Sequence, residues 1–136
     1  MITRMTHTSI FVHDQEEALK FYRDILGFEV RGDFNQGGFR WLTVGPKSQP
    51  DLEIVLMATT ANPALSEESA QALQKLLKSG QMSIGVFETD DAMRDYEEWT
   101  KQGVAFLDAP TEQYGAISAN VKDFSGNMFS LRQLKK

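Results

Sequence analysis

The sequence has no cysteine, and this absence excludes several kinds of chemistry at once. Disulfides, thiolate zinc sites and cysteine nucleophiles all require that residue. Histidine is also scarce, with 2 in the chain, so a site built from several imidazoles has little to draw on. The 14 basic residues are outnumbered by 19 acidic ones, for a net charge of −5. This balance argues against a nucleic-acid partner, which would need a basic face to displace counterions.

Long hydrophobic runs are also missing. No stretch approaches the ~20 apolar residues that span a bilayer, and the first residues lack the apolar core of a signal peptide. We therefore expect a cytoplasmic protein that has no membrane partner. The 136 residues are 41% hydrophobic and 24% charged, which is ordinary for a globular chain. That length suits a single domain over 1–136.

The first half of the chain predicts a strand, a helix and further strands. A strand over 7–13 ends at Asp14, which can cap a helix with Glu17 three residues later. Apolar residues then recur at helical spacing up to Gly27, a residue type that commonly terminates helices. A strand begins at 28–30, and three more are expected around 31–34, 39–44 and 52–58.

The same order returns in the second half of the chain. A strand over 83–88 leads to Asp90 and Asp91, a helical stripe follows, and Gly103 ends it before a strand at 104–106. The interval from Asp14 to Gly27 equals the interval from Asp90 to Gly103, which indicates an internal duplication. Strands over 114–121 and 128–134 complete the second copy. We predict module one at about 1–60, a linker helix at about 66–79 and module two at about 81–136.

This pattern resembles the vicinal oxygen chelate superfamily, which includes glyoxalases, bleomycin-resistance proteins and extradiol dioxygenases. Five features carry the resemblance: the stretch from His7 to Asp14, the stretch from Ala18 to Tyr22, Leu26-Gly27-Phe28, Tyr114-Gly115, and the turn that begins at Asp123 and runs to Leu131. The resemblance implies an α+β fold in which two βαβββ modules form a cup-shaped, half-barrel mixed sheet with helices outside. It also implies a homodimer.

Strand alternation then predicts which side chains face the cup, because successive residues point to opposite faces. The fifth strand, for example, would direct Ser83, Gly85 and Phe87 inward. Several inward residues are aromatic and suit a flat or apolar ligand. The predicted ligand-binding residues are His7, Phe11, Phe39, Trp41, Glu53, Val55, Phe87, Tyr114, Ser130 and Arg132.

The resemblance also implies where a metal would bind. Metal-dependent relatives carry ligands on the first, fourth, fifth and eighth strands, and His7 matches the first of these positions. Ser83 and Ser130 replace the usual ligands on the fifth and eighth strands, while Glu53 lies one pleat from the fourth-strand position. His13, the other histidine, would lie roughly 20 Å from His7 along one extended strand. We therefore expect no metal cofactor.

These observations favour a protein that binds a small, partly aromatic molecule in its cup without a metal. Drug sequestration is one form of that function. One alternative is a glyoxalase-like lyase or isomerase, or a dioxygenase, that uses a divalent metal with His7 and Glu53 as candidate catalytic residues. Another is a structural or regulatory dimer whose cup is filled by its own side chains.

Overall fold

The computed structural model describes residues 1–135, so Lys136, the last residue of the predicted second module, lies outside it. The chain divides into two compact units, Met1–Lys75 and a second that begins at Leu76. The boundary falls inside helix α2 (Glu67–Ser79), which lies where the sequence predicts a linker helix. Each unit is a mixed sheet with helices, so the predicted α+β class is confirmed.

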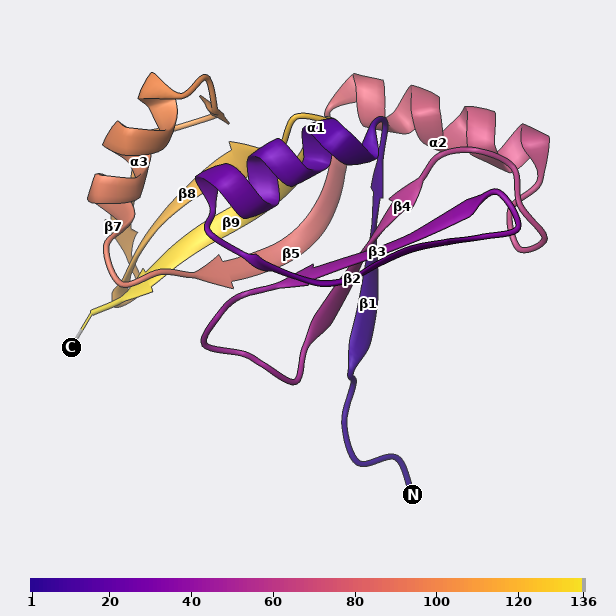
Figure 1. Cartoon of the computed structure of the whole chain (residues 1–136). Coiled ribbons are helices and arrows are strands. Elements are labelled where there is room, and N and C mark those ends of the chain that lie inside the picture. Colours follow the sequence, from indigo (N-terminus) through magenta and orange to yellow (C-terminus); the bar gives the residue numbers. More distant parts are fainter. Residues whose placement is uncertain (136) are drawn as a thin grey trace. The chain divides into compact units, whose positions relative to one another are not determined.

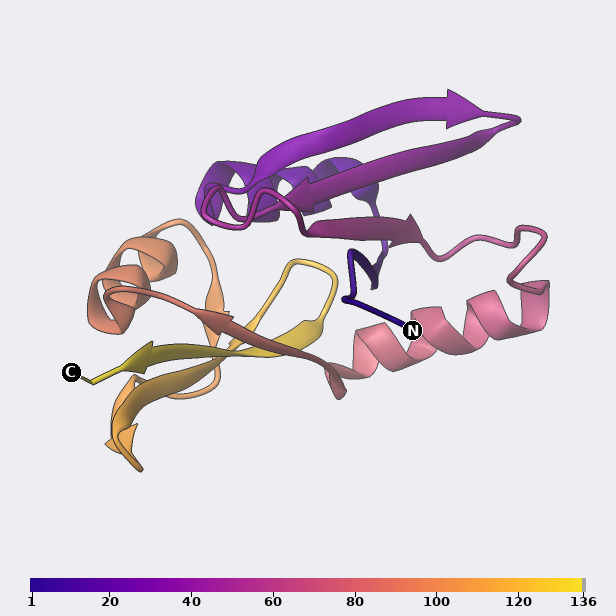
Figure 2. The ribbon, with the colours of Figure 1, turned by 90° about the horizontal axis from the view of Figure 1, so that it is seen from below.

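The first unit is a four-stranded sheet in the order β1-β4-β3-β2. Strands β1 and β4 pair in parallel and the other pairs are antiparallel. Figure 2 shows β2 and β3 as a long hairpin beside β4. The two short strands predicted at 28–30 and 31–34 are one strand interrupted by a bulge at Arg31. The elements are β1 (His7–Val12), α1 (Gln15–Leu19), η1 (Lys20–Ile25), β2 (Glu29–Gln36), β3 (Phe39–Gly45) and β4 (Glu53–Ala58).

One face of this sheet packs against the helix that runs through α1 and η1 (Figure 1). The rings of Phe21 and Tyr22 are fully buried there and meet edge to face, with centroids 4.9 Å apart. The sheet supplies alternate apolar residues to the same core, as the sequence predicts. These core residues are Ile10, Val12, Leu42, Val44, Ile54 and Leu56.

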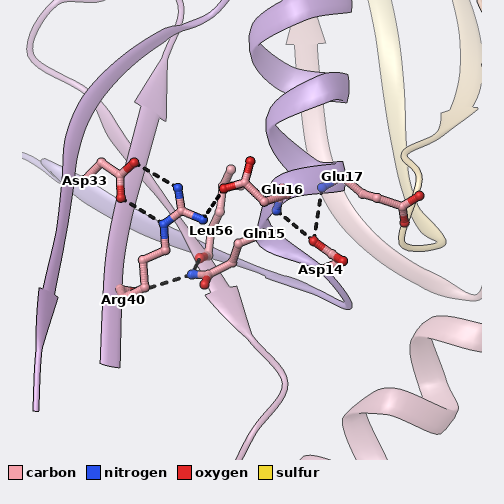
Figure 3. A network of polar contacts seen from close by, with 7 residues as sticks. All are labelled: Asp14, Gln15, Glu16, Glu17, Asp33, Arg40 and Leu56. Atoms are coloured by element: carbon pink, nitrogen blue, oxygen red, sulfur yellow. Dashed lines mark hydrogen bonds and ion pairs between the residues drawn. The ribbon is translucent and has the colours of Figure 1, made fainter. Parts of the chain in front are cut away.

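A charged network fastens the start of α1 to the sheet (Figure 3). Arg40 on β3 donates from Nε and Nη2 to the two carboxylate oxygens of Asp33 at 2.8 and 2.9 Å, and from Nη1 to Glu16 at 2.7 Å. Gln15 donates beside it to the carbonyl oxygens of Arg40 and Leu56. Hydrogen bonds to Asp33 and Glu16 raise the pKa of Arg40, and the bond from Arg40 lowers the pKa of Asp33.

The second unit repeats this topology. Its sheet has the order β5-β9-β8-β6, with β5 and β9 parallel, and a short extra strand, β7, pairs with β8. When β7 is left out of the count, the first, fourth, third and second strands of each unit occupy equivalent places, which supports the predicted duplication. The elements are β5 (Met82–Glu88), α3 (Ala92–Lys101), β6 (Ala105–Phe106), β7 (Thr111–Gln113), β8 (Ala116–Lys122) and β9 (Asn127–Leu134).

The two copies differ by a residue in two places. Asp14 caps the first helix, but Asp91 caps the second, so the stretch from cap to terminal glycine is one residue longer in the first unit. The first helix takes up its extra residue in the π-helical turns of η1. The second unit instead carries its extra residue in a β5 bulge between Ser83 and Gly85. Gly27 and Gly103 both end their helices with positive φ, as expected.

The bulge makes the predicted face of Phe87 wrong. Before it, Ser83 pairs with Met128, but after it Phe87 pairs with Leu131, a core residue. The Phe87 ring meets the buried Phe129 ring at 5.0 Å, edge to face. Phe87 therefore belongs to the core face. Its neighbour Val86, 62% exposed, takes the opposite face.

The predicted strand position of Tyr114 is also wrong. Tyr114 lies in the tight turn between β7 and β8, with φ of 52°, and not in the strand predicted over 114–121. Its side chain is fully exposed. The turn dipeptide with Gly115 reverses the chain so that Gln113 pairs directly with Ala116. Within residues 1–135, no helix is long and apolar enough to cross a membrane.

Candidate functional site

The sheet of the first unit has a second face, turned away from α1 and η1, which we call the distal face. His7 begins β1 and Glu53 begins β4, and the parallel pairing puts them directly side by side. His7 Nε2 lies 3.0 Å from Glu53 Oε2. The two side chains are 45% and 32% exposed, so the pair is accessible from solvent.

Two threonines hold this pair in place. The Thr43 hydroxyl, fully buried on β3, donates to Glu53 Oε1 at 2.8 Å. The Thr6 hydroxyl lies 2.9 Å from His7 Nδ1, and the Thr6 carbonyl accepts from the Glu53 backbone N–H at 2.9 Å. Both carboxylate oxygens and both ring nitrogens therefore have defined partners.

Aromatic side chains flank the pair on the same face. The Trp41 ring lies 6.3 Å from the His7 ring, centroid to centroid, at an angle of 46°. Phe34 pairs with Trp41 across the hairpin and is 53% exposed. Gly32 on β2 pairs with Thr43 and lies close to Trp41. A Cβ added at this glycine would come within 3.2 Å of Thr43 Oγ1 and 3.5 Å of Trp41 Cδ1. The absence of a side chain at Gly32 thus leaves room for Trp41 and Thr43.

The other predicted residues of this unit also fall on the distal face. Val55 pairs in register with Ser9 and Thr43 and is buried. Phe11 pairs with Met57, and Phe39 lies two residues before Trp41 at the tip of β3. The structure thus brings His7, Trp41 and Glu53 together, and it places Phe11, Phe39 and Val55 on the same sheet face.

In the second unit, Ser130 and Arg132 lie on the face opposite its core. Ser130 pairs with Val86 and Asn120, and Arg132 pairs with Ser118. Ser83 lies on that face before the bulge. Phe87 and Tyr114 do not join these residues, because the half-buried Phe87 ring lies on the core face and Tyr114 lies in an exposed turn.

The donor atoms on the distal face do not fit the metal site of metal-dependent relatives. Among residues 1–135, no group of three or more His, Asp or Glu side chains is arranged so that it could hold a metal ion. His7 and Glu53 bond to each other, and Ser83 and Ser130 stand where the resemblance would put stronger ligands. Divalent ions of this chemistry prefer several imidazoles and carboxylates.

Sequence reasoning missed two contributors to the site. Phe34 is hard to assign because the Arg31 bulge interrupts the alternation of β2, yet counting back from the Gly37-Gly38 turn pairs it with Trp41. Thr6 precedes the predicted strand, and its contact with His7 depends on the Glu53 backbone bond. No sequence pattern signals that second contact.

Comparisons with known proteins show similar sequences and a similar fold. The crystal structure of UcmS2 has a TM-score of 0.89 and is 39% identical, covering 97% of this chain and 98% of that one. TnmS3, an antibiotic binding protein from Streptomyces sp. CB03234, has a TM-score of 0.76 and 28% identity, with 98% of both chains covered. The uncharacterised protein YurT of Bacillus subtilis (strain 168) is 35% identical over 127 residues, 93% of this chain and 95% of its own. The family model matches residues 4–131, and the chain therefore belongs to the Glyoxalase/Bleomycin resistance protein/Dioxygenase superfamily.

Proposed function

We propose that this protein binds and sequesters a small, partly aromatic molecule, without a metal, at the distal face of its first sheet. The observation that carries the proposal is the cluster of Trp41, His7 and Glu53, where two rings stand beside an accessible carboxylate. Flat side chains offer stacking surface, and a few fixed polar groups orient the ligand. A relative that is 28% identical over nearly its whole length is an antibiotic binding protein, which supports an antibiotic as the bound molecule.

Metal-free binding is the part of this proposal that separates it from the enzymatic alternative. A glyoxalase-like lyase or a dioxygenase of this family would hold a divalent ion with His7 and Glu53. We expect elemental mass spectrometry to find no stoichiometric metal after incubation with nickel, zinc, manganese or ferrous iron and desalting. Near-stoichiometric metal that disappears in His7→Ala would refute metal-free binding and redirect the work to hemithioacetal and catechol substrates.

Ligand binding can be tested by thermal shift with a panel of planar aromatic compounds. A ligand present at 100 times its Kd stabilises the folded state by about 2.7 kcal/mol, which corresponds to several degrees in Tm. Trp41→Ala should reduce the affinity about tenfold or more, because it removes the ring beside His7. Met93→Ala on α3, an exposed apolar residue in the other unit, is the matched control and should leave the affinity unchanged.

We propose a cytoplasmic homodimer as the setting for this binding. Light scattering coupled to size-exclusion chromatography should give twice the mass of the 136-residue chain. A dimer that shifts with no member of the panel would favour the structural alternative, in which the protein's own side chains fill the cup.

A further inference from the structure

The Glu53 carboxylate keeps acceptor capacity after its internal contacts are counted. Within residues 1–135, Oε1 accepts from the Thr43 hydroxyl and Oε2 from His7. An ionised carboxylate has about four lone-pair positions, so about two remain. The side chain is 32% exposed, so these positions can be reached from outside.

The His7 ring, by contrast, has no acceptor left to offer. Its Nε2 faces a carboxylate oxygen at 3.0 Å and therefore carries the hydrogen. Its Nδ1 lies 2.9 Å from the Thr6 hydroxyl, which donates to it when the ring is neutral.

Taken together, the polar part of the cluster presents acceptors next to a ring surface. A carboxylate that accepts from a donor forms a charge-assisted hydrogen bond, stronger than one between neutral groups. A ligand carboxylate or phosphate at the same place would meet like charge and would leave the lone pairs unpaired.

We propose that Glu53 selects ligands that carry an N–H or O–H donor on their ring system, namely aromatic amines, protonated heterocycles and phenols. This rests on the binding function proposed above and specifies its ligand class. The ring of such a ligand lies against Trp41, and its donor group reaches the remaining lone pairs of Glu53. His7 and Thr43 act as positioning residues, because each holds one carboxylate oxygen.

Three probes with one ring system test this selection: 9-aminoacridine, acridine and acridine-9-carboxylate, measured by calorimetry at about pH 8. They present a cationic donor, an uncharged ring with no donor, and an anion. The wild-type chain should bind 9-aminoacridine at least tenfold more tightly than acridine, and acridine-9-carboxylate most weakly. In Glu53→Gln the preference for 9-aminoacridine should fall to about twofold, while acridine affinity stays within about twofold of wild type.

Glu97→Gln on α3 is the matched control, because it removes the same charge from the second unit. It should keep the full preference. If Glu53→Gln unfolds, Glu53→Asp provides a second test, because its side chain is shorter by one methylene and draws the carboxylate back from the ligand; the preference for 9-aminoacridine should then fall, and an unchanged preference would refute the selection.

The outcomes separate the two proposals. If acridine and 9-aminoacridine bind wild type and Glu53→Gln with the same ratio, the donor selection is refuted and the binding function stands. Donor selection is refuted in the same way if Glu97→Gln loses the preference equally, because net charge then explains it. If no probe binds the wild-type chain, the binding function itself fails in this test, and the selection fails with it.

Discussion

Thr43→Val tests whether the buried Thr43 hydroxyl on β3 stabilises the fold through its hydrogen bond to Glu53. Valine keeps the branched shape and strand preference of threonine, so the substitution removes the hydroxyl with little change in packing. A hydrogen bond to a charged group contributes about 1.5–3 kcal/mol when it is well buried. Glu53 is 32% exposed, so water can take over part of this bond. We therefore expect a loss of about 1 kcal/mol in the free energy of unfolding, or roughly 4 °C in Tm.

The decisive measurement is a double-mutant cycle by urea unfolding. In Glu53→Ala the fully buried Thr43 hydroxyl loses its hydrogen-bond partner, and an unpaired buried hydroxyl destabilises the folded state. In the Glu53→Ala background, Thr43→Val should therefore no longer lower the free energy of unfolding and could raise it. Thr59→Val, at another buried threonine, should cost the same in both backgrounds. An equal cost for Thr43→Val with and without Glu53 would refute the reasoning.

Three further predictions concern the rest of the fold. Phe87→Ala should destabilise by about 2 kcal/mol in urea unfolding, because the half-buried ring packs against the core residue Phe129, while Val86→Ser should cost less than about 1 kcal/mol; the reverse order would contradict the β5 bulge. Gly126→Ala should lower Tm severely or prevent folding, since its Cβ would clash with the Leu77 carbonyl oxygen of α2 and its φ is +102°; a Tm close to that of wild type would contradict this close approach. Arg40 lowers the pKa of Asp33, so this pair stabilises the fold at neutral pH and loses that effect as the pH falls below about 4. Asp33→Asn should therefore cost stability near pH 7, measured by urea unfolding, and little near pH 2; an equal cost at both would rule out the ion pair as the source.

Much of the first unit could be predicted from local patterns. Alternation puts His7, Trp41 and Glu53 on one sheet face, and this succeeds because β1, β3 and β4 carry no bulge within the register that joins them. The direct contact between His7 and Glu53 could not be predicted, because it depends on the parallel pairing of two strands that are far apart in the sequence. In sequence terms, Glu53 lies on the expected face but one pleat from the expected ligand position.

The second unit is harder to predict because its irregularities are invisible in the residue pattern. Phe87 follows a bulge that reverses every later side chain of β5, and no glycine or proline rule fixes which residue bulges. Tyr114 adopts a left-handed conformation, which is uncommon for a bulky residue, and an aromatic residue is more typical of a strand. The predicted topology survives these local errors because strand order depends on the elements and not on their exact ends.

The two compensating insertions bear on how the halves of this chain can be aligned. The number of residues from Asp14 to Gly27 equals the number from Asp90 to Gly103, so the two repeats can be aligned over this stretch without a gap. In the structure, this ungapped alignment pairs each residue with the neighbour of its true equivalent between the β5 bulge and the end of α3. A deletion of one residue at the bulge would act on β5 as several substitutions at once, exchanging the residues of its two faces. Changes of chain length, and not only changes of residue type, can therefore exchange the residues on the two faces of this sheet.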